Sequence, residues 1–446
     1  MKNDFQYYKN IIVGAGAAGL FCAANMDVKW DEDNETSARV IQTSREDTTV
    51  ILEKTAKPGT KLLMAGGGQC NVTHGGSIKD FITRYGDKGK KIRGVLQRHN
   101  NIELCNFMER MGVPLTERED GKIFPRSLRG RDVLGALLEE TRRKNIAIRC
   151  NEEVLTIERL GERGGKDAGE LCNPGDYGRF KITTAGNTFI CENLIVATGG
   201  CSYPSTGSDG SMISIIERDL GLKIVTPVPS LTPVFVENYP FGELSGISFK
   251  EVGITAFDSK GRKVFQAYGD ILLTEKNLSG PVIINSSRYM RAGMKLSVNF
   301  LGNRRPEDIE ESCKRDFPGN SKAPQTYLTE DLKLPKRFAQ TMVDTVGISA
   351  RKVSQMTGKE IRALVLAVTA HTFTISGVAG FKEAMATAGG VSLEEINIST
   401  MEAKNIPGLY LIGEMVDVDG DTGGYNLQFA YSSAKAAAEN IGKGQK

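Results

Sequence analysis

Six residues near the N-terminus, 14–19 (GAGAAG), have the types and spacing of a turn that binds a pyrophosphate. In such a turn the first glycine allows the tight bend, the second lets the backbone approach the phosphates, and the third lets a helix pack against a strand. The helix that follows offers unpaired N–H groups and a partial positive charge to an anion. The sequence therefore predicts a dinucleotide held by Gly14, Gly16, Ala17, Ala18 and Gly19, with a purely structural glycine turn as the alternative.

An acidic residue, Glu53, ends the next apolar run, residues 49–53. A carboxylate at the tip of the second strand of such a fold accepts the ribose hydroxyls of the dinucleotide. The acid usually follows the glycines by about 20 residues, but Glu53 lies 39 residues beyond Gly14. The polar stretch 27–48 accounts for the excess as a surface insertion that leaves the strand end in place.

Three further glycine-rich segments favour FAD over a nicotinamide. Residues 61–73 (KLLMAGGGQCNVT) indicate backbone that lies against a flat ring or a pyrophosphate. Residues 194–200 (LIVATGG) end a buried strand in a turn of the kind that passes over the cofactor in flavoproteins with two dinucleotide folds; an ordinary strand exit is the alternative. Residues 408–431 deliver Gly413 and Glu414, and then lead into a helix whose N–H groups can meet a flavin carbonyl or a phosphate.

No metal site is expected. The acidic run 417–421 (DVDGD) resembles a calcium loop, but its twelfth position is Gln428 rather than a carboxylate. The eight cysteines stand at least ten residues apart, which excludes zinc knuckles and the CxxxxC pair of disulfide reductases. Scattered cysteines of this kind are typical of reduced thiols, so a cytoplasmic protein is expected.

Length and charge limit the remaining classes. A chain of 446 residues is too long for one compact core, so two or three domains are expected. With 57 basic against 54 acidic residues the net charge is +3, which argues against a nucleic-acid partner. No run of 18 apolar residues occurs, so no membrane span is predicted. The oligomeric state stays open.

Alternating strands and helices must position these motifs. The hydrophobic pattern predicts an α/β fold, and its elements are strands at 8–13, 49–53, 193–198 and 408–413 and helices at 17–26, 93–112, 131–145 and 432–441. Strands at 152–157, 180–184 and 187–191 predict a meander, with a glycine-rich loop at 161–178. Between about 205 and 377 the pattern changes to β segments at 233–237, 251–257, 263–267 and 295–300, followed by helical spacing over 305–365.

Seven stretches, in order along nearly the whole chain, give the sequence a family resemblance. They are GAGAAGL, KLLMAGGGQCNVTH, GKIFPRS, ATGGCSYPSTGSDG, NLSGPVI, GFKEAMATAGGVSLEEIN and GLYLIGEMVDVDGDTGGYNLQFAYSSA. By these the chain resembles the BaiN/YhiN-like, or aminoacetone oxidase-like, family of FAD-dependent oxidoreductases. The sequence departs from the family pattern in the insertion 27–48 and at Gln69, where the family often has arginine.

The resemblance implies a Rossmann-type FAD domain of the two-dinucleotide-fold kind, formed by residues 1–204 and 378–446. It implies an inserted β-rich substrate domain, 205–303 and 366–377, and a small helical domain, 304–365. The implied FAD contacts are Gly14, Gly16, Gly19, Glu53, Lys61, Gly67, Gly68, Asn71, Val154, Thr198, Gly199, Gly413, Glu414, Asp417, Asn426 and Leu427. Lys54 and Cys70 are expected to join them.

The family resemblance leaves the reaction open. One branch resembles reductases of 3-oxo bile acids, in which N5 of reduced flavin passes a hydride to a conjugated 4,6-diene and a protein acid supplies the proton. No second GxGxxG is visible, so NAD(P)H is expected to bind transiently as the electron donor. The other branch resembles oxidases of small amino-ketones. A flavin-containing protein that binds RNA or a protein partner is a third hypothesis.

Candidates for the proton donor are Tyr203 and Tyr425, which stand in loops expected beside the cofactor; packing against the flavin edge is their alternative. The three histidines, His74, His99 and His371, stand in no motif that demands a base and are expected to be structural. Cys70 and Cys201 have no neighbour in sequence that would lower a thiol pKa, so neither is expected to be a nucleophile. A roomy apolar cavity in the inserted domain would favour a steroid, and a small polar one an amine.

Overall fold

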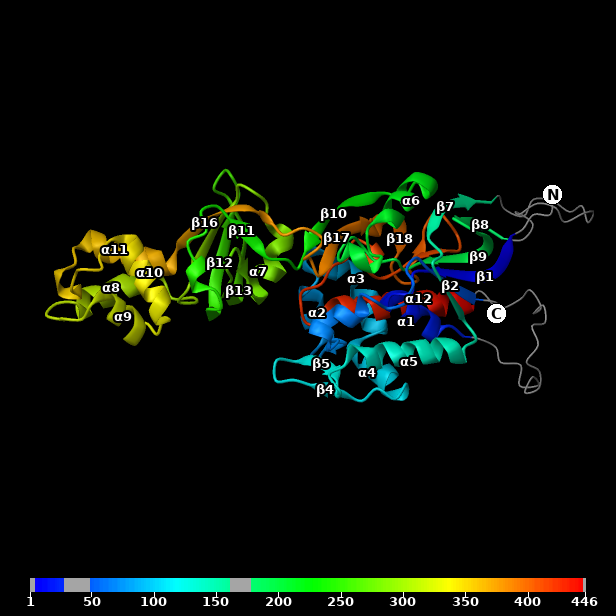
Figure 1. The fold of residues 1–446 in the computed structure, drawn as a ribbon, viewed down its shortest axis with the longest axis horizontal. Helices are drawn as coiled ribbons and strands as arrows, with labels where there is room; N and C mark the ends of the chain where they lie inside the picture. The colour runs from blue at the N-terminus through cyan, green and yellow to red at the C-terminus, as the bar shows by residue number, and fades with distance from the viewer. Residues whose placement is uncertain (1–4, 28–48, 161–177, 444–446) are drawn as a thin grey trace, which may run out of the picture. The chain divides into compact units, whose positions relative to one another are not determined.

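The computed structural model describes residues 5–27, 49–160 and 178–443. The expected insertion at 27–48 and the expected loop at 161–178 therefore lie almost wholly outside the described residues. The chain forms two compact units, Met1–Val228 with Ala386–Lys446, and Pro229–Met385. The first unit thus continues to Val228, whereas the sequence pattern places the change of character near residue 205. Figure 1 shows both units in the colours of the chain.

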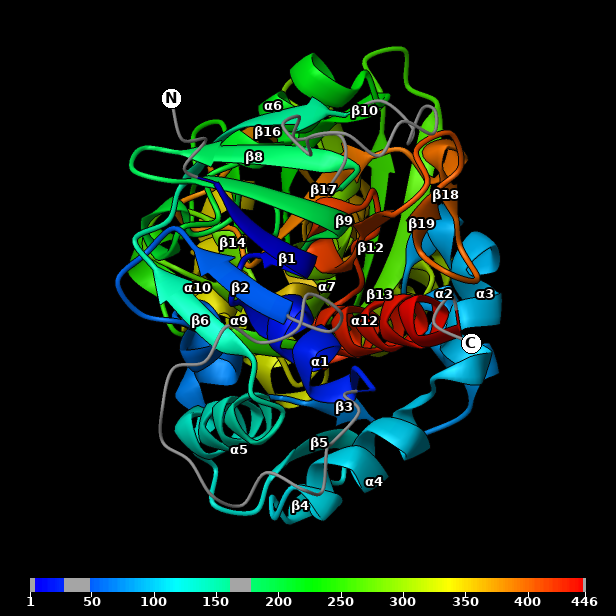
Figure 2. The same ribbon diagram turned by 90° about the vertical axis from the view of Figure 1, so that its right-hand side faces the viewer.

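The first unit is built on a parallel sheet. Its parallel strands are, in spatial order, β6 (Ala147–Cys150), β2 (Thr49–Glu53), β1 (Gln6–Val13), β9 (Thr188–Val196) and β20 (Leu409–Leu411). Ile12 lies opposite Ile51 on one side and Ile195 on the other, and all three are fully buried. Because the strands are parallel, their carboxyl ends lie at one edge of the sheet, the edge at which open α/β sheets bind ligands. Figure 2 shows β6, β2, β1 and β9 side by side.

Antiparallel strands extend this sheet. The meander of β7 (Val154–Arg159) and β8 (Phe180–Thr184) pairs with the first half of β9. The expected strands 187–191 and 193–198 are one strand, β9, which continues through the half-buried Glu192 and Asn193. On the other side β19 (Glu402–Ala403) and β18 (Ile396–Asn397) continue from β20.

Two helices from opposite ends of the chain pack together, as Figure 2 shows: α1 (Ala17–Asn25) and α12 (Tyr425–Lys443). The last helix begins seven residues before the expected 432. The helix expected over 93–112 is two helices, α3 (Gly89–Arg98) and α4 (Asn101–Arg110). Asn100 causes the break, because its side chain accepts the Glu103 N–H at 3.0 Å and so caps α4.

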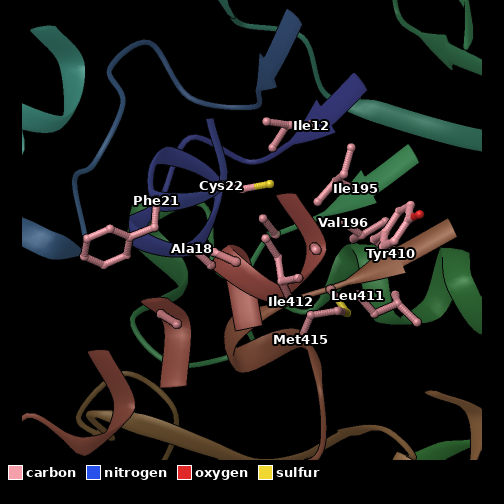
Figure 3. Close-up of a cluster of buried hydrophobic side chains, with 14 of the residues drawn as sticks. Ile12, Ala18, Phe21, Cys22, Ile195, Val196, Tyr410, Leu411, Ile412 and Met415 are labelled. Carbon is pink, nitrogen blue, oxygen red and sulfur yellow. The ribbon is translucent and has the colours of Figure 1, made fainter. Parts of the chain in front are cut away.

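The core of the first unit lies where α1 meets the sheet. Figure 3 shows a cluster of buried side chains contributed by α1, β1, β9, β20 and the segment after β20. Phe21 and Cys22 of α1 are fully buried there, as are Val196 and Ile412. The small residues of α1 let its backbone approach the strands closely, so the helix N-terminus is held rigidly against the carboxyl ends of β1 and β9.

The second unit is a closed barrel with attached helices. Its strands, in order around the barrel, are β11 (Val234–Val236), β14 (Leu278–Ser279), β13 (Lys263–Leu273), β12 (Ser248–Phe257), β15 (Lys295–Asn299) and β16 (His371–Val378). Its helices are α7 (Pro281–Ser286), α8 (Pro306–Asp316), α9 (Pro324–Glu330), α10 (Lys336–Val346) and α11 (Gly358–Thr369). Figure 1 shows α8 to α11 gathered at one end of the barrel. Closure leaves the barrel without the unpaired strand edge of an open sheet.

Aromatic rings fill the end of the barrel nearest these helices. Phe300 and Phe338 have ring centroids 4.6 Å apart, and Phe249 lies within 4.8 Å of both. His371 stacks among Phe241 and Phe373, and burial lowers the pKa of its imidazole. His371 is half-buried and packs against these rings, and a structural role for it stays the expectation. Among the described residues, no helix is both long and apolar enough to cross a membrane.

Candidate functional site

In the glycine turn after β1, no atom of the described residues occupies the space that a side chain at Gly16 would take. Gly14 has φ 102°, and a Cβ there would stand 2.8 Å from the Ala197 carbonyl oxygen. A Cβ on Gly19 would stand 2.0 Å from the Gly14 oxygen. A Cβ on Gly16 would meet no atom of the described residues within 4 Å. Gly16 is the N-cap residue of α1, and no side-chain hydrogen bond caps this helix. Packing therefore requires Gly14 and Gly19, whereas the space at Gly16 fits a ligand approaching the helix N-terminus.

Glu53 fixes this turn from the end of β2. Its Oε2 accepts the Ala15 N–H at 2.8 Å, and its Oε1 accepts the Thr55 N–H at 2.8 Å and the Thr55 hydroxyl at 2.7 Å. The residue is only 8% exposed. A carboxylate has about four acceptor positions, so Glu53 retains capacity for a ribose hydroxyl. Lys54 instead pairs with Asp209 and Glu153 at 2.6 and 2.7 Å.

Thr198 carries the clearest sign of a missing partner. It follows β9, and its Cα lies 3.0 Å from where a Gly14 Cβ would stand. Its Oγ1 is buried and finds no hydrogen-bond partner among the described residues. Buried hydroxyls almost always have a partner, so one that lacks it beside an open turn fits a bound polar ligand. The next residue, Gly199, has φ 77°, and a Cβ there would stand 2.8 Å from Ser208 Oγ.

An ion pair joins the two halves of the split unit. Lys61 Nζ lies 2.6 Å from Glu414 Oε2 and 2.6 Å from Ser202 Oγ. Glu414 Oε1 also accepts the Ser202 hydroxyl at 2.8 Å and the Thr387 N–H at 2.7 Å. The Thr387 hydroxyl in turn accepts the Cys201 N–H at 2.8 Å. Lys61 and Glu414 are thus brought together by contacts within the protein, and their contact with FAD stays a prediction.

The glycine run 66–68 is a left-handed turn. Gly66, Gly67 and Gly68 have φ values of 59°, 65° and 87°, and a Cβ on Gly67 would meet nothing within 4 Å. The Asn71 amide ties this loop to the C-terminal segment: its nitrogen donates to the Thr73 oxygen at 2.8 Å, and its oxygen accepts the Gly424 N–H at 3.2 Å. The backbone at Gly67 is therefore open to a ligand while Asn71 holds the loop in place.

Cys70 and Cys22 should resist thiol reagents in the native protein. Burial raises the pKa of each thiol to about 12, so almost no reactive thiolate exists at pH 8. We expect a disulfide reagent to label neither residue at pH 8, but to label both in 6 M guanidinium chloride, as mass spectrometry of the peptides would measure. Because unfolded thiols ionise near pH 9, the stability that their protonation contributes should be lost as the pH rises from 9 toward 12. Rapid native labelling of Cys70 would contradict this.

The residues of the C-terminal segment that are expected to contact FAD also have structural partners. Gly413 has φ 65°, and a Cβ there would stand 2.7 Å from the Ala18 Cβ, so this position also requires glycine. Asn426 closes its own loop, because its side chain bonds both the N–H and the oxygen of Gly420. Asp417 is buried and pairs with Lys88. The remaining expected contacts, Val154 and Leu427, pack against the core.

The two tyrosines proposed as proton donors have different surroundings. Tyr425 is 4% exposed and stacks on His74, with centroids 5.3 Å apart, and against Phe81 at 5.0 Å. Burial raises the pKa of its hydroxyl. This placement favours the packing alternative for Tyr425. Tyr203 is half-buried with φ 54°, and its hydroxyl makes no hydrogen bond to the described residues. Their catalytic roles stay predictions.

Sequence reasoning missed several polar partners. Ser202, Ser208 and Thr387 surround Lys61 and Glu414, and all three stand within stretches that carry the family resemblance. Arg118 was also missed. Its guanidinium lies 3.9 Å over the Phe124 ring and donates to Gln69 Oε1 at 2.7 Å. A cation thus stands beside position 69 although that residue is glutamine.

Taken together, three features fit FAD: the glycine turn, the Thr198 hydroxyl that has no partner among the described residues, and the free space beside Gly16 and Gly67. The N-terminus of α1 and Gly16 would hold the pyrophosphate, Glu53 the ribose, and Gly67 with Thr198 the remainder of the cofactor. Within the part of the chain that the structure describes, no group of three or more histidines, cysteines or acids is placed to hold a metal ion.

Comparisons with known proteins agree on the family. A ribosomal RNA dihydrouridine synthase from Haemophilus influenzae is 30% identical over 441 residues, which cover 98% of this chain and 99% of the relative. A protein of the same name from Escherichia coli is 29% identical, with 97% of each chain covered. A 3-dehydro-bile acid delta(4,6)-reductase from Clostridium scindens is 29% identical and covers 96% of this chain and 98% of the relative.

The solved structure of a 3-ketosteroid-delta4-(5alpha)-dehydrogenase from Rhodococcus jostii aligns with a TM-score of 0.47 at 14% identity, over 98% of each chain. The model of the HI0933-like protein Rossmann domain matches residues 8–440. That match confirms the resemblance inferred from the motifs, and so the chain belongs to the HI0933-like family of FAD-binding Rossmann oxidoreductases.

Proposed function

We propose that this protein reduces a carbon–carbon double bond conjugated to a carbonyl, and that the bond is C5=C6 of a uracil in ribosomal RNA. One observation carries the proposal: the names of three relatives matched over nearly their whole length all describe saturation of such a bond, in uridine or in a bile acid. In both compounds the double bond is polarised by a carbonyl, so one flavin chemistry serves both.

The net reaction adds two hydrogens across the double bond and oxidises NAD(P)H to NAD(P)⁺, with one proton taken up. Bound FAD, once reduced, supplies the hydride. The chain's own residues hold the cofactor: the α1 N-terminus offers N–H groups to the pyrophosphate, and Glu53 keeps the turn closed. Tyr203, whose hydroxyl has no partner among the described residues, is the better of the two proposed proton donors.

Charge distribution favours RNA as the substrate. Residues 229–385 contain 21 lysines and arginines against 16 acids, a charge of +5, and the rest of the chain carries the compensating −2. The near-neutral total therefore conceals a basic unit of the kind that attracts phosphates. The bile-acid substrate remains the second candidate, because the Clostridium scindens relative is nearly as similar.

Anaerobic stopped-flow spectroscopy tests both substrates. We expect NADH or NADPH to bleach the flavin absorbance of the purified enzyme, and a uridine-containing fragment of ribosomal RNA to restore it with formation of dihydrouridine, measured by mass spectrometry. Restoration by a 3-oxo-4,6-diene bile acid alone would favour the second candidate. Peroxide production from aminoacetone and oxygen, with no response to NAD(P)H, would overturn the reductase and indicate an oxidase.

A further inference from the structure

We propose that a pocket in the second unit binds a phosphate and the adjoining base of an RNA strand, an inference that rests on the proposed RNA substrate. The pocket has a volume of about 290 Å³. It lies where the start of β12 and the turn after β15 meet the connection between α9 and α10. Pockets for drug-sized ligands start at about 300 Å³, so this one suits a group no larger than a nucleotide.

Three cations line the pocket: Lys250, Arg304 and Lys333. All three are exposed, and none has an ion-pair partner among the described residues. Three unpaired cations around one hollow repel one another and attract an anion of more than one charge. A phosphate backbone meets this requirement.

Acidic residues close in sequence do not neutralise these cations. Asp308 pairs with Arg305 at 2.6 Å. Glu330 and Asp331 pair with Lys322 at 3.2 and 2.8 Å. Glu251 follows Lys250 but is not part of the pocket lining. Arg304 helps to lower the pKa of the nearby Asp308, but none of the three cations forms an ion pair with these acids, so most of the positive charge of the pocket is left for a ligand.

Two phenylalanines contribute to the lining of the pocket. Phe249 and Phe300 line it, both are at most 6% exposed, and their centroids lie 4.8 Å apart. The backbone is irregular beside two of the cations: the pairing of β12 with β13 shifts between Phe249 and Val252, and Lys333 has φ 59°. Because both rings are almost fully buried, a base bound here must stack on an exposed ring beside the pocket.

A tyrosine beside the pocket extends the surface for bases. Tyr268 of β13 is 57% exposed, and its ring lies over Gly253, where a Cβ would stand 3.1 Å from the ring. The same Cβ would stand 2.9 Å from the oxygen of Gly302, in the turn that leads to Arg304. An exposed, flat ring next to a cation pocket is the arrangement that stacks unpaired bases of single-stranded RNA.

Fluorescence anisotropy with the FAD-loaded full chain and a labelled single-stranded 12-mer of uridylate tests the pocket. We expect the variant K250Q/R304Q/K333Q to bind at least tenfold more weakly at 50 mM salt. The slope of log Kd against log salt should fall by about 2, since each phosphate contact on a single strand contributes about 0.7. Y268A should weaken binding fivefold or more and leave the slope unchanged, because stacking is not ionic.

The control variant K260Q/K359Q/K382Q removes three exposed lysines of the same unit that do not line the pocket, and should keep the wild-type slope. An equal loss of affinity for uridylate in both triple variants would overturn the pocket as the binding site. It would indicate that RNA binds through the overall positive charge of the unit. Equal competition by polyglutamate would overturn the assignment to RNA. If the wild type makes dihydrouridine but K250Q/R304Q/K333Q binds uridylate unchanged, only the pocket fails; if the wild type neither binds RNA nor makes dihydrouridine, the proposed function fails with it. Circular dichroism and a thermal unfolding temperature like that of the wild type confirm that each variant folds.

Discussion

Replacing Gly16 with alanine should weaken FAD binding at least tenfold, about 1.4 kcal/mol, and leave the apoprotein as stable as the wild type. The added methyl group meets no atom of the described residues within 4 Å, and Gly16 has φ −80°, which alanine adopts freely. The methyl group is therefore expected to collide with a ligand at the N-terminus of α1 rather than with the protein. The ratio of 450 nm to 280 nm absorbance after purification, FAD titration of the apoprotein and thermal unfolding measure these effects.

Two other glycine variants provide the comparison. Gly19→Ala places its Cβ 2.0 Å from the Gly14 backbone oxygen, so it should destabilise the apoprotein itself. Gly94 lies on the exposed face of α3, and a Cβ there would meet no atom of the described residues within 4 Å. Gly94→Ala should therefore stabilise the apoprotein by about 0.5–1 kcal/mol without altering FAD affinity. Full FAD occupancy in Gly16→Ala would show that the pyrophosphate does not approach this turn.

Local features of this site could be predicted from the sequence. The glycine spacing and the apolar runs on either side locate β1, α1 and β2, because a turn and its flanking elements depend on neighbouring residues. Glu53 could be placed at the strand end despite the 39-residue separation, since an insertion in a connection leaves strand ends where they are. The helix boundary at Asn100 was missed, although an asparagine before an apolar run is a capping signal.

Contacts between distant parts of the chain could not be predicted. Lys61 and Glu414 are 353 positions apart, and the parallel order β2–β1–β9–β20 brings their loops to one edge of the sheet. The second unit illustrates the same limit. Its strands were partly recognised, but their closure into a barrel depends on pairing between β11 and β16, from its two ends. The cation pocket, formed by three separate segments, has no signature in any one of them.

Glu53 should contribute to the stability of the apoprotein as well as to the binding of FAD. Glu53→Gln keeps the size of the side chain but replaces one acceptor oxygen with an NH₂ group. That group must face either the Ala15 N–H or the Thr55 N–H, so one buried donor loses its partner. We expect the apoprotein to lose about 1–3 kcal/mol of unfolding free energy, as urea denaturation measures. Glu158→Gln, which alters an acid that is 61% exposed and paired with Lys181, should change it by less than about 1 kcal/mol.

Glu53→Gln should also weaken FAD binding at least tenfold. A further measurement can distinguish a loosened turn from a lost ribose contact as the cause. Glu53 Oε2 holds the Ala15 N–H, so it fixes the turn before any ligand arrives. If this fixing matters, Glu53→Gln should also weaken binding of pyrophosphate alone, which has no ribose, measured as competition with FAD. Weaker FAD binding with unchanged pyrophosphate binding would assign the effect to the lost ribose contact. Unchanged stability together with unchanged FAD affinity would contradict both roles, and the turn would then owe its order to Gly14 and the sheet.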